Sequence, residues 1–213
     1  MIDLSLPVEK LRNVGAKNLP RLKKLGIKTV KDLLWHFPAR YDDYSRIMPI
    51  ADLQPDERVN VQGTVMKISV RRIFPRRMTI IEALVEDDTG TIKAVWFNQP
   101  YIANTLTEGS RVSLAGAVKL DKHGLYLASP TYERLRDDAY LVHNLTHTQG
   151  LVPVYPETEG VTSKYLRFLI KPLLSEVSIE DPLPASITER NNFIPLKKAV
   201  HDVHYPLATE DAD

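Results

Sequence analysis

Three neighbouring aromatic residues are the best candidates in this sequence for binding a ligand. They are Trp96, Phe97 and Tyr101, in the segment TIKAVWFNQPY at residues 91–101. The segment alternates as a β-strand does, so Trp96 and Phe97 should point to opposite faces of a sheet. Exposed aromatic side chains beside basic ones are the surface on which unpaired nucleic-acid bases stack. The alternative is that Trp96 and Phe97 are both core residues.

Basic residues are concentrated in the first part of the chain. Residues 1–80 contain 16 Lys/Arg and 8 Asp/Glu, although the net charge of the whole chain is only +1. Arginine pairs bidentately with phosphate oxygens, so a basic segment that flanks Phe74 and Pro75 predicts phosphate contacts. Its cations are Lys67, Arg71, Arg72, Arg76 and Arg77. The alternative is a solvated surface on which cations cluster by chance.

The sequence suggests no catalytic group. It contains no Gly-Lys pair, so the phosphate-binding P-loop cannot be written anywhere in it. His143 and His147 are four residues apart, but no third ligand is near them, and we expect no metal site. The lack of cysteine rules out disulfides and thiolate ligands and favours a reducing compartment. We therefore expect a binding module with no cofactor of its own, not an enzyme.

An alternating pattern with a period of two residues begins at residue 58 and predicts five strands. The strands are expected at residues 58–73, 76–87, 91–97, 110–120 and 125–135. The segment NQPYIANTLTEG between the third and fourth strands suggests a short helix. Three strands, a helix and two strands are the order of the OB-fold, a five-stranded Greek-key barrel. The predicted fold class is thus mainly β, with a five-stranded SH3-like barrel as the alternative.

The barrel is expected to occupy residues 51–136, with a different kind of structure on each side. Residues 1–50 predict a helical extension. Its segment LRNVGAKNLPRLKKLGIKTVKDLL resembles a helix-hairpin-helix element, in which Lys17 is the candidate phosphate ligand. The alternative is a helical hairpin that merely supports the barrel. Residues 137–213 predict an irregular linker with one amphipathic helix, which Pro172 should break or kink.

The sequence also bears on location. No apolar stretch approaches the ~20 residues that span a bilayer, and the N-terminus lacks the pattern of a signal peptide. We expect a cytoplasmic monomer that has no membrane partner.

Four stretches resemble the RecG family of ATP-dependent DNA helicases and occur in the family's order. They are GAKNLPRLKKLGIKTVKDLLWHFPARYDDYS, GTV at 63–65, RRMTIIEALVEDDTGTIKAVWFNQPY, and LVPVYPETEGV. The resemblance runs from about residue 10 to about residue 200. It implies that the OB-fold is a wedge domain, which splits a branched DNA junction while two RecA-like motor domains pull the duplex.

The resemblance also implies particular partners and site residues. Phe97 and Tyr101 would stack on bases at the branch point, and Trp96 would be a third member of this stacking surface. The partners would be branched or single-stranded DNA, at replication forks and recombination junctions, and the motor domains of the full-length protein. ATP and Mg²⁺ are expected only for those motor domains. The alternative is an OB-fold adaptor that binds a peptide and no DNA.

Overall fold

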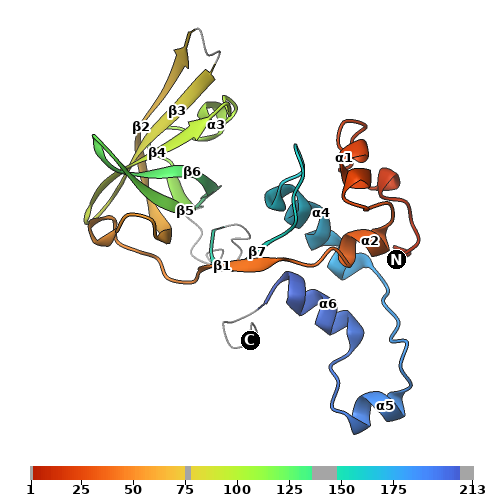
Figure 1. Ribbon diagram of the computed structural model, residues 1–213. Helices are drawn as coiled ribbons and strands as arrows, with labels where there is room; N and C mark the ends of the chain where they lie inside the picture. Colours follow the sequence, from red (N-terminus) through yellow and green to blue (C-terminus); the bar gives the residue numbers. More distant parts are fainter. Residues whose placement is uncertain (1, 75–77, 136–147, 207–213) are drawn as a thin grey trace. The chain divides into compact units, whose positions relative to one another are not determined.

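The computed structural model describes residues 2–74, 78–135 and 148–206. The chain forms two compact units (Figure 1). Unit 1 combines Met1–Asp42 with Pro153–Asp213, and unit 2 is Asp43–Val152. Within the described ranges, no helix has both the length and the apolar character needed to cross a membrane.

Unit 2 is a closed barrel of five strands. The strands are β2 (Arg58–Ile73), β3 (Met78–Asp87), β4 (Gly90–Phe97), β5 (Arg111–Asp121) and β6 (Gly124–Arg134). Their order around the barrel is β2-β3-β4-β6-β5, and every neighbouring pair is antiparallel except β4 with β6. Helix α3 (Ile102–Thr105) lies between β4 and β5, and the short helix η2 (Ile50–Asp52) precedes β2. This arrangement confirms the OB-fold predicted from the strand order.

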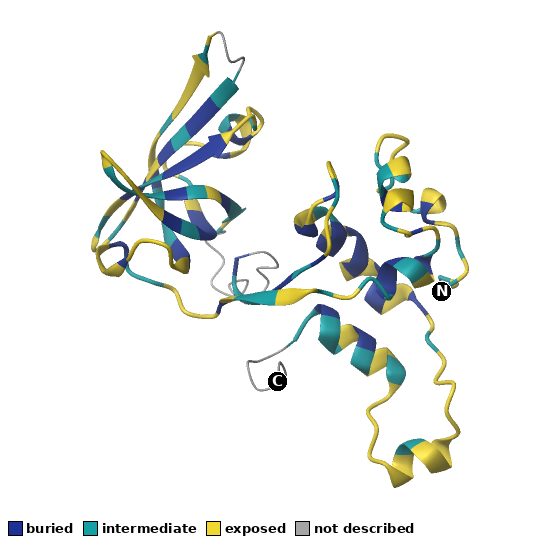
Figure 2. Cartoon of the chain, viewed as in Figure 1, coloured by how far each residue is buried: buried dark blue, intermediate teal, exposed yellow. Residues whose placement is uncertain are grey.

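The barrel interior is filled by one side of each strand. Along β4 the interior side chains are Ile92, Ala94 and Trp96, and Val95 on the other face is buried as well. The buried stretches of the strands are dark blue in Figure 2. The interior residues include Val61, Ile81, Ala94, Trp96 and Leu114. Gly63 lies where β2 crosses close to β3, because a Cβ there would come within 2.4 Å of the Glu86 carbonyl oxygen. A bulge between Val65 and Lys67 follows, so the rest of β2 can bend with β3.

Unit 1 is helical and takes its core from both ends of the chain. Its helices are η1 (Val8–Lys10), α1 (Leu19–Lys24), α2 (Val30–Leu34), α4 (Ser163–Glu176), α5 (Ala185–Arg190) and α6 (Leu196–His204). Leu22, Leu33 and Leu34 share one core cluster with Leu166, Ile170 and other residues of α4. The sequence suggested three consecutive parts, in which residues 137–213 were a linker. The structure instead groups Pro153–Asp213 with Met1–Asp42, because the apolar residues of the two segments bury one another.

Local signals in unit 1 have clear physical causes. Thr29 and Asp32 form a capping box at the start of α2, where the Thr29 hydroxyl accepts from the Asp32 backbone at 3.2 Å. Pro172 lies inside α4 but does not end it, since the helix continues to Glu176. Strands β1 (Arg40–Tyr44) and β7 (Gly150–Val154) pair as a two-stranded sheet, and the boundary between the units falls within both.

Candidate nucleic-acid interface

The end of β4 determines which aromatic residues can meet a ligand. Trp96 is 1% exposed, its Nε1 donates to the Pro130 carbonyl oxygen at 2.7 Å, and its ring meets the edge of Tyr132. A ring withdrawn from solvent into the barrel cannot receive a base. The prediction that Trp96 belongs to a stacking surface is therefore wrong, since the inner face of β4 is the one that carries it.

Phe97 lies on the outer face of β4. It is 41% exposed and lies directly opposite Ile80 of β3. The next residue, Asn98, turns the chain with a φ of 55°, a conformation that Asn tolerates better than most residues. Asn98 forms two hydrogen bonds with the backbone of Thr79. The side-chain Oδ1 of Asn98 accepts from the Thr79 backbone amide at 3.0 Å, and the backbone amide of Asn98 donates to the Thr79 carbonyl oxygen at 2.7 Å. These bonds fix the backbone that carries the Phe97 ring.

Tyr101 is the N-cap of α3 and is 57% exposed. Its hydroxyl donates to Gln99 Oε1 at 2.6 Å. Partial burial, with a smaller contribution from Tyr132, raises the pKa of Tyr101 above its usual value. The phenol therefore stays neutral at physiological pH, and both Phe97 and Tyr101 offer uncharged aromatic surface to solvent.

Phe97 lines a hollow of about 730 Å³ on the outer face of the barrel. Strands β2, β3, β4 and β6 and the end of β5 contribute to it, together with the turn between β5 and β6. Its rings are Phe97 and Tyr126, its cations Arg71, Lys93 and Lys122, and its carboxylates Glu82 and Asp121. In an OB-fold this face, bounded by the loops after the first and fourth strands, is where oligonucleotides bind.

The predicted phosphate ligands are distributed over both units. Arg71 lies in the hollow, where Nη2 is 3.8 Å from Glu82 Oε1; the two side chains are 65% and 31% exposed, so the pair is weak. Arg72 and Lys67 are exposed on β2. Lys17 is exposed in unit 1, two residues before α1. Arg76 and Arg77 lie outside the described residues.

The sequence reasoning missed Lys93 and Tyr126. Lys93 could have been found, because it precedes Phe97 by four residues on the same face of an alternating strand. Tyr126 could not, because its place beside Lys93 depends on the parallel register of β4 and β6.

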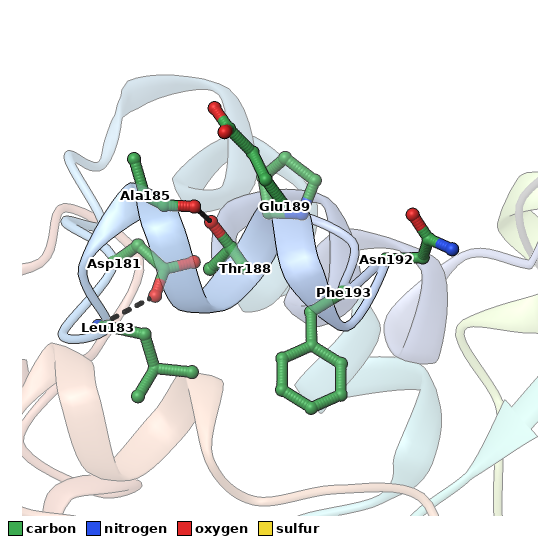
Figure 3. A pocket seen from close by; sticks show the side chains of 8 residues that line it. Asp181, Leu183, Ala185, Thr188, Glu189, Asn192 and Phe193 are labelled. Atoms are coloured by element: carbon green, nitrogen blue, oxygen red, sulfur yellow. Dashed lines mark hydrogen bonds between the residues drawn. The ribbon is translucent and has the colours of Figure 1, made fainter.

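Other sites receive little support. Within residues 2–74, 78–135 and 148–206, no three His, Asp or Glu side chains form a group that could hold a metal ion. His143 and His147 lie outside those ranges. A second hollow of about 550 Å³ in unit 1 is lined by α5 and the segments that flank it, and Figure 3 shows its Asp181 accepting a hydrogen bond from the Leu183 amide. Its lining contains Asp181 and Glu189 but no Lys or Arg, so it does not suit phosphate.

Comparison with known proteins links this geometry to a family. Residues 7–177 match the family model of the RecG wedge domain. The ATP-dependent DNA helicase RecG of Thermotoga maritima is 29% identical over 216 residues, which cover 96% of this chain and 26% of that protein. The RecG helicase of Haemophilus influenzae is 35% identical, over 95% of this chain and 28% of that protein. The RecG helicase of Escherichia coli K12 is 33% identical, over 96% of this chain and 29% of that protein.

A solved structure described as RecG bound to a three-way DNA junction agrees with the whole chain. It gives a TM-score of 0.79 at 27% identity, and the match covers 99% of this chain and 28% of that one. The chain therefore spans a little over a quarter of the length of these relatives. The family match includes the β4 strand, the aromatic turn after it and parts of both units. The chain belongs to the RecG wedge domain family.

Proposed function

We propose that this chain is the DNA-binding wedge of a RecG-like helicase and holds branched or single-stranded DNA at forks and recombination junctions. The observation that carries the proposal is the exposed Phe97 ring, which lines a hollow together with Arg71 and Lys93 on the OB-fold's binding face. Phe97 and Tyr101 would stack on unpaired bases, and the surrounding cations would contact phosphates.

The chemistry suits a ligand of any base sequence. Every base has an aromatic face, so stacking tolerates any of them. Phosphate contacts by Arg and Lys likewise carry no sequence information. A wedge that must meet whatever sequence a junction presents needs both properties.

We assign ATP hydrolysis to the remainder of the full-length relatives, in RecA-like motor domains that use ATP and Mg²⁺. Since the present sequence contains no Gly-Lys pair, we expect no ATP turnover from it alone, with or without DNA.

A salt titration of fork binding tests the proposal. Each phosphate contact contributes a slope of about −0.9 to log K against log[salt] on duplex, or about −0.7 on single strands. Replacing Arg71 and Arg72 with Gln should flatten the slope by one such unit for each residue that reaches a phosphate. The control replaces Arg190 and Lys197, which are exposed in unit 1, in the same way.

The outcome separates DNA binding from the rival function. A steep slope that the Arg71 and Arg72 substitutions reduce, and the control does not, supports the proposal. A shallow slope with weak fork binding would favour an adaptor that holds a peptide in the barrel hollow, because an apolar contact releases few counterions.

A further inference from the structure

Tyr126 is a second aromatic residue on the outer face of the barrel. It lies opposite Lys93, which precedes Phe97 by four residues on β4. On β4, Phe97 and Lys93 point to the same side, because side chains alternate with a period of two. Lys93 is paired with Tyr126 on the neighbouring strand β6. Phe97 and Tyr126 therefore lie near opposite ends of one hollow, and both line it.

The separation of the two rings sets the length of strand that fits between them. Four residues along a strand cover about 13 Å at ~3.3 Å per residue. Stacked bases repeat every ~3.4 Å. The span therefore corresponds to about four base steps, so bases stacked on the rings of Phe97 and Tyr126 would be about three to four nucleotides apart.

The charges around Tyr126 suit a phosphate backbone better than those in the middle of the hollow. The register joins Lys67, Leu84, Lys93 and Tyr126 in one row across four strands, and no carboxylate belongs to that row. Glu82 lies opposite Val95, between Lys93 and Phe97 along β4, and forms an ion pair with Arg71. Within this row Lys67 and Lys93 provide cations on both sides of Leu84.

The turn between β5 and β6 completes this end of the hollow. Asp121, Lys122 and His123 line the hollow beside Tyr126. Lys122 adds a cation at the rim and Asp121 a carboxylate, so this end of the hollow keeps a positive balance through Lys93 and Lys122.

We propose that the hollow is a single-strand track, in which Tyr126 stacks on a base about three to four nucleotides from the base held by Phe97. Lys93 contacts the intervening phosphates. The ligand class is single-stranded nucleic acid of any sequence, and the inference rests on the proposed function of the Phe97 site. It assigns to Tyr126 and Lys93 a role in holding the strand as it leaves the branch point.

A fork with a fluorescent base analogue tests the track one position at a time. 2-Aminopurine, whose emission is quenched by stacking, is placed in the single-stranded arm either next to the branch or three to four nucleotides from it. Wild-type chain should quench both probes. Tyr126→Ala should restore emission at the distal probe alone and weaken binding by about five- to 150-fold, the usual effect of one stacked base. Tyr126→Phe, which keeps the ring, should behave as wild type.

Further variants separate failure of the track from failure of the whole proposal. Phe97→Ala should restore emission at the branch probe, and Phe168→Ala, an exposed aromatic in unit 1, should change neither. If Tyr126→Ala leaves the distal probe and the affinity unchanged while Phe97→Ala weakens binding, the track is refuted and the branch-point site stands. If neither substitution affects fork binding, the proposed function fails as well.

Lys93→Gln keeps the test decisive if Tyr126→Ala does not fold. Loss of one phosphate contact on a single strand should flatten the salt slope by about 0.7. An unchanged slope would refute the assignment of Lys93 to the track.

Discussion

Adjacent residues Trp96 and Phe97 should respond to truncation in opposite ways. Trp96 is 1% exposed and is hydrogen-bonded to Pro130, whereas Phe97 is 41% exposed on the outer face. Replacing a buried Trp with Ala costs about 3–5 kcal/mol of folding free energy, and the Pro130 carbonyl also loses its partner. Fully burying a Phe side chain contributes about 1.5–3 kcal/mol. Because Phe97 is only partly buried, Phe97→Ala should cost about 1–2 kcal/mol of folding free energy.

Binding should show the reverse order. Loss of a base stacked on Phe97 should cost about 1–3 kcal/mol, or roughly a five- to 150-fold loss of fork affinity. Trp96→Phe, a milder change that retains an aromatic core residue, should leave the affinity of the folded fraction unchanged. Phe97→Leu preserves an apolar contact with the sheet but removes the ring, so it should lose affinity with little loss of stability.

Urea denaturation and fluorescence anisotropy with a model fork, both at one fixed salt concentration, measure the two effects. Affinities are compared per folded molecule, with the folded fraction taken from the denaturation curve. The reasoning is refuted if Phe97→Ala loses 3–5 kcal/mol of stability and its folded fraction still binds the fork as wild type does. That result would make Phe97 a core residue despite its exposure.

Two further perturbations follow from the charges. Glu82→Gln should tighten fork binding about two- to three-fold at low salt, because a carboxylate at a distance of about 7 Å would repel a bound phosphate by about 0.6 kcal/mol in a water-like dielectric. A weaker complex would show that Glu82 contacts the ligand favourably. Burial lowers the pKa of His204 below its usual 6.5, so the unfolded chain takes up the proton first and stability should fall as pH drops below about 6.5. Urea midpoints at pH 7.5, 6.0 and 5.0 should show this fall in wild type and a smaller one in His204→Gln, and equal pH dependence in the two would contradict the assignment.

The barrel was predictable because its signals are local. Alternation with a period of two identifies each strand, and the helix between the third and fourth strands singles out the OB-fold. The capping residue Thr29 was also predictable, because Asp32 lies three residues after it and lies within reach of the Thr29 amide.

Long-range packing was not predictable. Alternation places Trp96 and Phe97 on opposite faces but does not say which face is inside, and that depends on how the sheet curls. The apolar residues of α4 were visible in the sequence, yet their partners lie more than a hundred residues earlier, at Leu22 and Leu33. Tyr126 was overlooked for the same reason, since the pairing of β4 with β6 brings it beside Lys93.

The two-part composition of unit 1 makes the barrel an insertion inside another unit of the chain. The chain enters the barrel unit through β1 and leaves it through β7, and these two strands are hydrogen-bonded to each other. The two connections between the barrel and the rest of the chain are therefore paired with each other, whereas a terminal domain has a single connection. The same connectivity limits how the protein can be divided. A fragment that stops before Pro153 would retain every strand of the barrel but leave Leu22 and Leu33 without the helix that covers them.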